Sequence, residues 1–393
     1  MGEFRDFVKN QKMDNFLQSA EMFSRYQKIG KEAYLFGGFE NEKLKIVGLA
    51  VKMREKLGKK VYNMPRGPIW DNEAADSGVV LSSFLDEVSG ILKKKGGMVL
   101  QVSPNVWRKR KTVAEEEKEA RQVGGGNEKA KSGEAELGEE VENGLVKEDW
   151  PEGEALRNSL AQSGFKNLGE YEQVKWAYIL ELNGKTPDDI LMGFRYSHRR
   201  NVRLAKDKYG ITIRETDDPT ILKEITEKTG ERRGFKDPEV KYYKDMKEAF
   251  SDKVKFLVAE WDGKGAKETE LAEVEAAKKQ HGGKIPVAAA MFLTYGGETI
   301  YLFSGSLREY KKYAGPHLMQ WEVIKKALSD GVSIYNFYGT HPVELLHEKG
   351  VYEFKRGFRG EFIEYVGTFA KALNVAGRAY LARLKYHEFG ELS

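Results

Sequence analysis

A pattern of apolar strands separated by polar turns occurs twice along the chain. In the first copy, strands open at Lys45-Ile46-Val47 and Lys60-Val61-Tyr62. In the second copy, they open at Lys284-Ile285-Pro286 and Thr299-Ile300-Tyr301. The distance from the first residue of one strand to the tyrosine of the next is seventeen positions in both copies. This equal spacing predicts two hairpins that are built alike.

The segments that follow the two hairpins also correspond. Each hairpin leads to a Gly-Pro loop, Gly67-Pro68 or Gly315-Pro316, and then to a helix with apolar residues at three- and four-residue spacing. The expected helices are Leu81–Lys95 and Leu318–Asp330, and the strands expected after them are Met98–Val102 and Ser333–Tyr338. The repeated order predicts a duplicated α/β protein with two similar lobes.

Two further helices are expected outside the repeat. Thr186 is a good N-cap with Pro187 in the first turn, so a helix is predicted to run to about Lys208 and to stop at Gly210. A final helix is predicted over Thr368–Tyr386, with one apolar face that returns to the first lobe. The first lobe would then comprise residues 1–172 and 368–393, and the second lobe residues 173–367.

Two polar segments interrupt this plan. Thr112–Lys147 contains no aromatic residue and has ten Glu against five Lys and Arg, so it cannot bury enough apolar surface to offset the entropy of ordering. We predict that it is a mobile insertion in the first lobe. Asp262–Lys284 contains a helix-prone run, Glu268–Gln280, with glycines at both ends, and predicts a surface excursion between two strands.

Composition narrows the class of protein. The 393 residues are 40% hydrophobic and 11% aromatic, enough for the cores of two or three domains. The longest apolar run, Ile285–Leu293, is too short to span a membrane, and the first residues lack the apolar stretch of a secretory signal, so a cytoplasmic protein is expected. The absence of cysteine excludes disulfides, cysteine-ligated metals and thiol nucleophiles.

One helix is rich in arginine. The net charge of +4 is mild, so a site for a polyanion must come from the placement of the charges. Arg195, Arg199, Arg203 and Lys206 follow spacings that put them on one helix face, and Arg200 adjoins them. Guanidinium groups suit phosphate oxygens, so this face is a candidate for nucleic-acid or diphosphate binding. The alternative is an ordinary solvated face.

Three loops carry the other candidate chemistry. Arg66–Asp71 holds a cation and a carboxylate around a rigid turn, or is only a strand-to-helix turn. Tyr313–Leu318 stands where an N-acetyltransferase places its pyrophosphate-binding turn but lacks the second small residue, which disfavours coenzyme A. Tyr352–Phe358 places a lysine after what is expected to be the last strand, where it would hold a phosphate or an oxyanion, or cap a strand edge. The spacing of His341 and His347 predicts no zinc pair.

In this order, these fragments resemble the Fem family of transferases that use aminoacyl-tRNA to build the interpeptide bridges of peptidoglycan. The matching stretches are Phe16-Leu17-Gln18-Ser19, Arg66-Gly67-Pro68 with Asp71, Gly164-Phe165, Asp188–Lys206, Tyr242-Tyr243, Ile300–Ser306, Gly315-Pro316 and Phe354-Lys355. They cover nearly the whole chain. The resemblance implies an α/β fold of two tandem lobes like those of GNAT-type N-acyltransferases, with mixed sheets flanked by helices. The short Asp262–Lys284 segment favours the plan of the FemX-like members.

The resemblance also implies an activity. An amino acid would move from aminoacyl-tRNA to the stem-peptide lysine amine of UDP-MurNAc-pentapeptide or lipid II. Aminoacyl-tRNA is the co-substrate, and neither a cofactor nor a metal is implied. A monomer is expected, and the basic residues of the C-terminal helix would allow peripheral contact with an anionic membrane. Two alternatives stay open: another N-acyltransferase that acts on a small molecule or protein N-terminus, and a binding module without catalysis.

The site residues follow from the same resemblance. The implied catalytic residues are Lys355 and Phe354, with Asp71 to orient the acceptor or relay a proton. The implied substrate-binding residues are Lys28, Arg66, Lys236, Tyr242 and Tyr301, with Arg25 or Lys31 as alternatives to Lys28 and Asp237 as an alternative to Lys236. The arginine-rich helix face could bind either the acceptor's diphosphate or the tRNA, and of these two we favour the tRNA for Arg199, Arg200 and Arg203. We expect Lys355 and neighbouring amides to stabilise the tetrahedral oxyanion.

Overall fold

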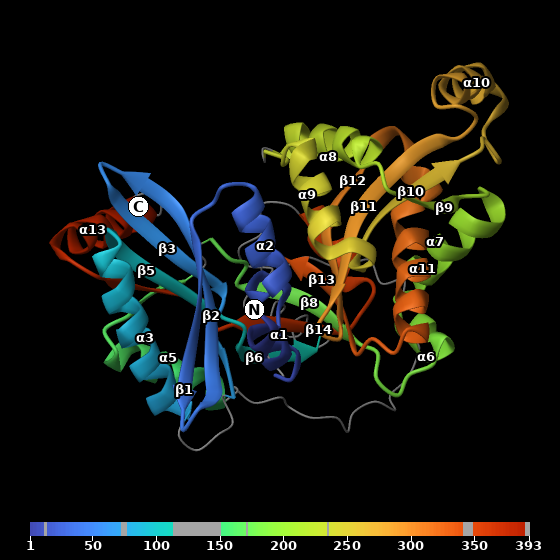
Figure 1. Cartoon of the computed structure of the whole chain (residues 1–393). Coiled ribbons are helices and arrows are strands. Elements are labelled where there is room, and N and C mark those ends of the chain that lie inside the picture. The colour runs from blue at the N-terminus through green and yellow to red at the C-terminus, as the bar shows by residue number, and fades with distance from the viewer. Residues whose placement is uncertain are drawn as a thin grey trace.

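The chain forms two mixed sheets that stand side by side, each flanked by helices (Figure 1). This computed structural model describes residues 1–11, 14–71, 77–112, 151–169, 172–233, 236–340 and 349–389. The expected insertion therefore lies outside the described residues, apart from Thr112, as do His341 and His347. The predicted fold class, α/β with two tandem lobes of mixed sheet, is confirmed.

The first sheet has the strand order β1-β2-β3-β5-β15-β7, and β4 pairs with β2. Its strands are β1 (Ala33–Glu40), β2 (Lys43–Lys56), β3 (Lys59–Arg66), β4 (Ile69–Trp70), β5 (Gly97–Pro104), β7 (Lys166–Gly169) and β15 (Thr368–Ala372). Its helices are α1 (Gly2–Lys9), η1 (Phe16–Gln18), α2 (Ala20–Lys28), α3 (Ser77–Lys94), α5 (Pro151–Gln162) and α13 (Val375–Phe389).

The second sheet has the order β6-β14-β8-β13-β12-β11-β10-β9. Its strands are β6 (Trp107–Thr112), β8 (Trp176–Glu181), β9 (Thr212–Thr216), β10 (Val254–Trp261), β11 (Ile285–Tyr295), β12 (Glu298–Ser306), β13 (Ile334–Gly339) and β14 (Glu361–Tyr365). Its helices are α6 (Pro187–Gly193), α7 (Tyr196–Arg203) with the π-helical turn η2 (Leu204–Lys208), α8 (Thr220–Arg233), α9 (Val240–Phe250), η3 (Ser251–Lys253), η4 (Glu268–Glu270), α10 (Leu271–Gln280), η5 (Arg308–Tyr313), α11 (Gly315–Ser329) and α12 (Lys349–Arg356). The predicted surface excursion is confirmed as η4 and α10.

The internal repeat is confirmed strand by strand. The hairpin β2–β3 is antiparallel, and after α3 the strand β5 lies parallel to β3. The hairpin β11–β12 is antiparallel, and after α11 the strand β13 lies parallel to β12. The parallel pairs differ in length: β3 and β5 stay paired as far as Arg66 and Pro104, whereas β12 and β13 pair only as far as Ile300 and Asn336. Beyond that point β12 and β13 diverge.

The two sheets exchange strands. β6 follows β5 along the chain but pairs with β14 in the second sheet, and β15 follows β14 but pairs with β5 and β7 in the first. As predicted, the C-terminal helix α13 packs on the first sheet, where Leu381 joins Val61 and Met98 in a small core. The predicted limits of the two domains, after residue 172 and before residue 368, stay a prediction. Strand β6 belongs to the first domain by sequence but pairs with β14 of the second.

The structure corrects two helices. Thr186 caps α6 with a reciprocal capping box and Gly210 ends η2, but the helix breaks at Phe194, whose extended backbone lets its buried ring pack on Trp321 and Phe358. The start of the predicted Thr368–Tyr386 helix is instead strand β15, because residues 368–372 complete the first sheet. The helix α13 begins only after it.

The N-terminal helices join the two lobes. In Figure 1, α1 and α2 lie between the two sheets. One core cluster includes Phe16 and Met22 from this segment, Leu49 from β2, and Phe250 and Met291 from the second lobe. A continuous apolar core therefore crosses the junction. Within the described ranges, no helix combines the length and hydrophobicity that a membrane-spanning segment requires.

Candidate active site

A cavity of about 900 Å³ occupies the place where β12 and β13 diverge. Its walls come from the end of β12, from α8, from η5 and the start of α11, from the end of β13 and from α12. Parallel strands that splay apart leave backbone groups without ladder partners, so the split is both a space and a source of hydrogen bonds. The first lobe has no such split between β3 and β5.

Side chains on both sides hold the strands apart. On β13, the backbone N–H of Tyr338 donates to Asn336 Oδ1 at 2.7 Å and Tyr338 has a φ of 61°, which turns the strand out of the ladder. Gly339 is pressed so closely on Val174 that an added Cβ would lie 2.6 Å from its Cγ1. On β12, the N–H of Ser306 donates to Thr229 Oγ1 at 3.3 Å. The split is therefore fixed by local bonds and packing.

Lys355 brings a buried positive charge to this cavity. It lies on α12 with 7% of its surface exposed, and its Nζ donates to the carbonyl of Tyr338 at 3.3 Å and to that of Gly339. Phe354, its neighbour, also lines the cavity. The expected position after the last strand is wrong: α12 lies between β13 and β14, so Lys355 does not cap a strand edge.

A pair of histidines lies beside Phe354. His317, the third residue of α11, lines the cavity, and its ring is 4.7 Å from the ring of His198 and 5.1 Å from that of Phe354. Asn201 Nδ2 lies 3.2 Å from His317 Nε2. Burial, aided by His198 and Lys311, lowers the pKa of His317 to about 3. Sequence reasoning missed His317, although it directly follows the Gly-Pro loop, because its neighbours His198 and Asn201 stand more than a hundred positions away.

Exposed cations stand at the rim of the cavity, and a carboxylate lies in its wall. Arg232, Arg308 and Lys311 are the exposed cations. Asp237 is buried and accepts hydrogen bonds from Thr226 Oγ1 at 2.9 Å and from the Tyr243 hydroxyl at 2.7 Å. Of the two alternatives at this position, Asp237 lines the cavity, and Lys236 is exposed and does not. Among the described residues, no group of histidine and acidic side chains could hold a metal ion.

Arg66 and Asp71 lie outside this cavity. Arg66 is buried, donates to the carbonyl of Val174 at 2.8 Å and stacks its guanidinium 3.6 Å above the ring of Tyr365. Because Val174 lines the cavity, Arg66 supports the wall from behind. Asp71 is exposed at the edge of the described residues. The predicted binding role of Arg66 and the predicted role of Asp71 stay predictions.

Lys28 and Tyr242 lie where α2 meets α9. Lys28 pairs with Glu248, and the guanidinium of Arg25 lies 4.6 Å from the centre of the Tyr242 ring. The Tyr242 ring packs 5.5 Å from that of Phe303, which lines the cavity, and burial raises the pKa of Tyr242 to about 12.

The structure thus sorts the predicted residues by their distance from the cavity. Tyr301, Phe354 and Lys355 line it together, and Tyr301 also stacks on Phe292 at 5.3 Å. Arg66 and Tyr242 stand one layer behind its wall. Lys28, Lys236 and Asp71 are not among the residues that line it.

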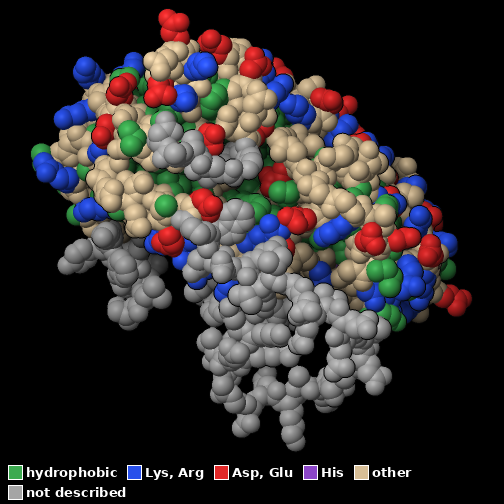
Figure 2. Space-filling model, turned by 90° about the horizontal axis from the view of Figure 1, so that it is seen from below, with side chains coloured by type: hydrophobic (Ala, Val, Ile, Leu, Met, Phe, Trp, Pro, Cys, Tyr) green, Lys and Arg blue, Asp and Glu red, His purple; other side chains and the backbone are tan. Residues whose placement is uncertain are grey.

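The arginine-rich face is divided by the helix break. Arg199 donates to the carbonyls of Met192 and Phe194 at 2.7 and 2.5 Å, and so caps the end of α6. Arg195 pairs with Glu353 at 3.0 Å. Arg200 and Arg203 are exposed. Figure 2 shows one face of the molecule, where Lys and Arg side chains lie among Asp and Glu side chains, in keeping with the small net charge.

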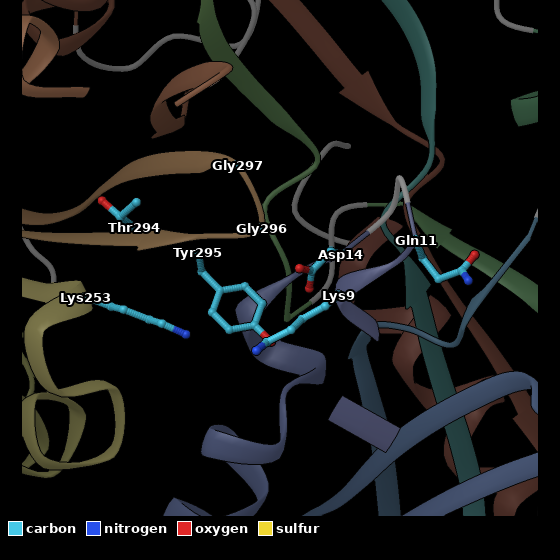
Figure 3. A pocket seen from close by; sticks show the side chains of 8 residues that line it. All are labelled: Lys9, Gln11, Asp14, Lys253, Thr294, Tyr295, Gly296 and Gly297. Carbon is cyan, nitrogen blue, oxygen red and sulfur yellow. The ribbon is translucent and has the colours of Figure 1, made fainter. Parts of the chain in front are cut away.

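A second cavity, of about 480 Å³, lies between the N-terminal segment and the turn of the β11–β12 hairpin. Figure 3 shows Asp14 and Lys9 beside Tyr295 and the Gly296-Gly297 turn. Burial raises the pKa of Asp14 to about 7, although Lys253 opposes the shift. This cavity lies at the junction of the lobes and contains none of the predicted catalytic residues.

Comparison with known proteins agrees with this architecture. The sequence profile of the FemAB family matches residues 1–132, 159–266 and 264–382. The chain belongs to the FemAB family. Aminoacyltransferase FemA of Staphylococcus aureus strain MW2 is 24% identical over 440 aligned positions, which cover 98% of this chain and 96% of the relative, and FemA of strain bovine RF122 / ET3-1 matches equally. The crystal structure of FemX has a TM-score of 0.71 at 20% identity, covering 95% of this chain and 96% of that one, and shares its fold. The predicted family is confirmed, and the predicted class of enzyme, an aminoacyltransferase, agrees with these findings.

Proposed function

We propose that this FemAB-family chain moves an amino acid from aminoacyl-tRNA to the stem-peptide lysine amine of a peptidoglycan precursor, UDP-MurNAc-pentapeptide or lipid II. The observation that carries the proposal is the split between β12 and β13, with the ammonium of Lys355 held inside it. An open site beside a fixed positive charge suits a carbonyl group that becomes negative during the reaction.

The chemistry needs little beyond positioning. An aminoacyl ester is already activated, so a neutral amine can attack it once the two are held together. The tetrahedral intermediate carries a negative oxygen, which the ammonium of Lys355 stabilises at short range. The carbonyls of Tyr338 and Gly339 orient the ammonium, so its position is set before the substrate arrives.

The rim of the cavity suits the acceptor end of tRNA. Arg232, Arg308 and Lys311 place cations around the opening, where they attract the phosphodiesters of a strand whose terminal ester enters the split. Arg200 and Arg203 would extend this contact along α7. Arg199 contributes less, because its guanidinium is engaged by the end of α6.

The start of α11 weakens the acyl-coenzyme A alternative. A pyrophosphate cradle uses successive backbone N–H groups at a helix N-terminus. Here the second residue of α11 is Pro316, which has no N–H, and the first, Gly315, is pressed against Val287. The acceptor would then bind in and beside the first lobe. The residues to test are Lys28, Arg66 and Asp71 of that lobe, and Lys236 and Tyr242 of the second lobe.

One experiment tests the proposal directly. The purified full chain is incubated with UDP-MurNAc-pentapeptide and a pool of charged tRNAs, and mass spectrometry looks for the addition of one residue. A parallel arm replaces the soluble acceptor with lipid II in detergent. Addition in either arm supports the proposal and identifies the acceptor. No addition in both arms, with acceptors and tRNAs that a known Fem transferase uses, would overturn it.

A further inference from the structure

His317 lines the cavity, and one of its ring nitrogens is buried without a hydrogen-bond partner among the described residues. Its ring stands nearly perpendicular to that of Phe354, with an interplanar angle of 83°. The atom Nδ1 is buried and has no hydrogen-bond partner within the part of the chain that the structure describes. A buried polar group without a partner is destabilising, so such a group on a residue that lines a cavity points to a ligand that completes its hydrogen bonds.

Asn201 determines which nitrogen of His317 carries the hydrogen. The amide nitrogen of asparagine only donates, so at 3.2 Å from Nδ2 the ring atom Nε2 must accept. A neutral imidazole has one hydrogen, which is therefore on Nδ1. The unpaired atom is thus an N–H donor and not a lone pair.

The surroundings keep His317 neutral. Its positive or titratable neighbours are His198 on α7, Lys311 on η5 and Lys355 on α12. Burial, His198 and Lys311 together lower its pKa to about 3, so the ring is too weak a base to take a proton from an amine at neutral pH. The site therefore offers a hydrogen-bond donor that does not change its charge.

We infer that the Nδ1–H of His317 is a second donor in the transfer site, which binds the carbonyl oxygen of the aminoacyl ester as that oxygen becomes negative, and that Asn201 is the positioning residue that fixes its tautomer. This inference rests on the proposed function. In the reaction, the amine nitrogen bonds to the ester carbon and the bond from that carbon to the ribose oxygen breaks. One proton leaves the amine and the ribose oxygen gains one, while His317 keeps its own.

His198 cannot take this role. Its Nε2 lies 2.9 Å from the carbonyl of Phe354, which satisfies that nitrogen, and the residue does not line the cavity. Burial lowers its pKa as well, so it also stays neutral. His198 holds α12 to α7, whereas His317 is among the residues that line the cavity.

The first test removes the donor. We expect H317F to lower kcat by about 100-fold, in the range found for the loss of one oxyanion donor, while the KM for charged tRNA changes less than threefold. The matched control is H281Q, which alters an exposed histidine at the end of α10 and should leave kcat unchanged. Circular dichroism and thermal unfolding verify that H317F is folded. A folded H317F with the kcat of the wild type would overturn the inference.

The second test reverses the tautomer. In N201D a carboxylate accepts from Nε2–H, so neutral His317 loses the hydrogen on Nδ1, and the pKa of the ring rises. At low pH the doubly protonated ring still donates from Nδ1. The ratio of N201D to wild-type kcat should therefore fall about 10-fold or more between pH 6 and pH 8.5. A ratio that is independent of pH would overturn the role of Asn201.

A third measurement does not depend on activity. ¹⁵N-labelled histidine spectra of the wild-type chain, assigned with H317F, should show the Nδ1–H tautomer at residue 317, and N201D should show the change. An Nε2–H tautomer in the wild type would overturn the inference. If the wild type transfers no amino acid to any acceptor, the proposed function fails, and the tautomer result shows separately whether the geometry of the site is as inferred.

Discussion

The two lobes share one sequence of elements but differ at one pair of strands. In the first lobe, β3 and β5 remain paired as far as Arg66, the last residue of β3. In the second lobe, the equivalent strands β12 and β13 part after Ile300 and Asn336, and a cavity opens between them. The two similar scaffolds thus differ in how far one pair of parallel strands stays paired, and the shorter pairing leaves room for the proposed transfer site.

The largest effect is expected from removing the positive charge of Lys355 from the split between β12 and β13. K355M should lower kcat by about 10²–10³-fold, because the oxyanion loses its nearest cation, with less than a threefold change in tRNA binding measured by filter retention. K326M, an exposed lysine on α11, is the control. Small and equal losses of catalysis and binding in K355M would contradict the role of Lys355.

Filling the split should stop transfer and spare the first lobe. S304W places an indole in the cavity beside β12, so we expect at least a 100-fold loss of transfer, with the affinity for UDP-MurNAc-pentapeptide changed less than twofold in calorimetry. V79W, at an exposed position of α3, should have neither effect. Equal loss of transfer in the two variants would remove the distinction between the lobes.

A smaller effect is expected at the junction of α2 and α9. If Lys28 binds the diphosphate of the acceptor, K28M should raise the KM for UDP-MurNAc-pentapeptide by about 5- to 10-fold. E248Q removes the observed ion-pair partner of Lys28 and keeps the lysine, so it should not raise KM. Should K28M and E248Q behave alike, Lys28 would be only a surface ion pair, worth less than about 1 kcal/mol.

On α7, the tRNA contact should depend on the exposed arginines. R200Q combined with R203Q should weaken tRNA binding by about 3- to 10-fold and lower the slope of log K against log salt by about 1–2, since two phosphate contacts are lost. R199Q should instead lower the melting temperature, because it uncaps α6. An unchanged salt slope in the double variant would exclude this face as a tRNA contact.

A separate effect, on stability and not on activity, is expected at the junction of the lobes. The pKa of Asp14 is raised to about 7, so between about pH 4 and pH 7 the native state binds a proton that the unfolded chain has lost. Asp14 therefore makes its full contribution to the free energy of unfolding at low pH. This contribution is lost as the pH rises from about 4 to 7. D14N removes that dependence, so its advantage over the wild type should grow to about 1–3 kcal/mol at pH 8 in urea titrations. D6N, at an exposed position of α1, should follow the wild type.

The duplication could be predicted because its signals are local. Equal hairpin spacing, Gly-Pro loops and helical periodicity all act over a few residues, and they predicted both hairpins, α3 and α11. The break at Phe194 and the strand Thr368–Ala372 depend on partners that lie far along the chain, so propensity favoured continuous helices there. The contact between Asn201 and His317 could not be predicted for the same reason, because the two residues lie 116 positions apart in the sequence.

Some residues of the candidate site could be predicted from the sequence, but the location of the cavity could not. Phe354, Lys355 and Tyr301 belong to recognisable fragments and line one cavity. Their chemistry depends on the divergence of β12 from β13, which arises from Asn336 and the backbone of Tyr338. A hydrogen bond that ends a ladder leaves no mark in hydrophobic periodicity, so the location of the cavity could not be derived from the pattern.

The exchange of β6 and β15 has a consequence for the history and handling of the molecule. A fragment ending near residue 172 would leave β7 without the strand that joins it to β5, and a fragment beginning at residue 173 would leave β14 exposed where β6 belongs. Unpaired strand edges promote aggregation. We therefore expect that neither half, cut at this boundary, would fold alone as a soluble fragment.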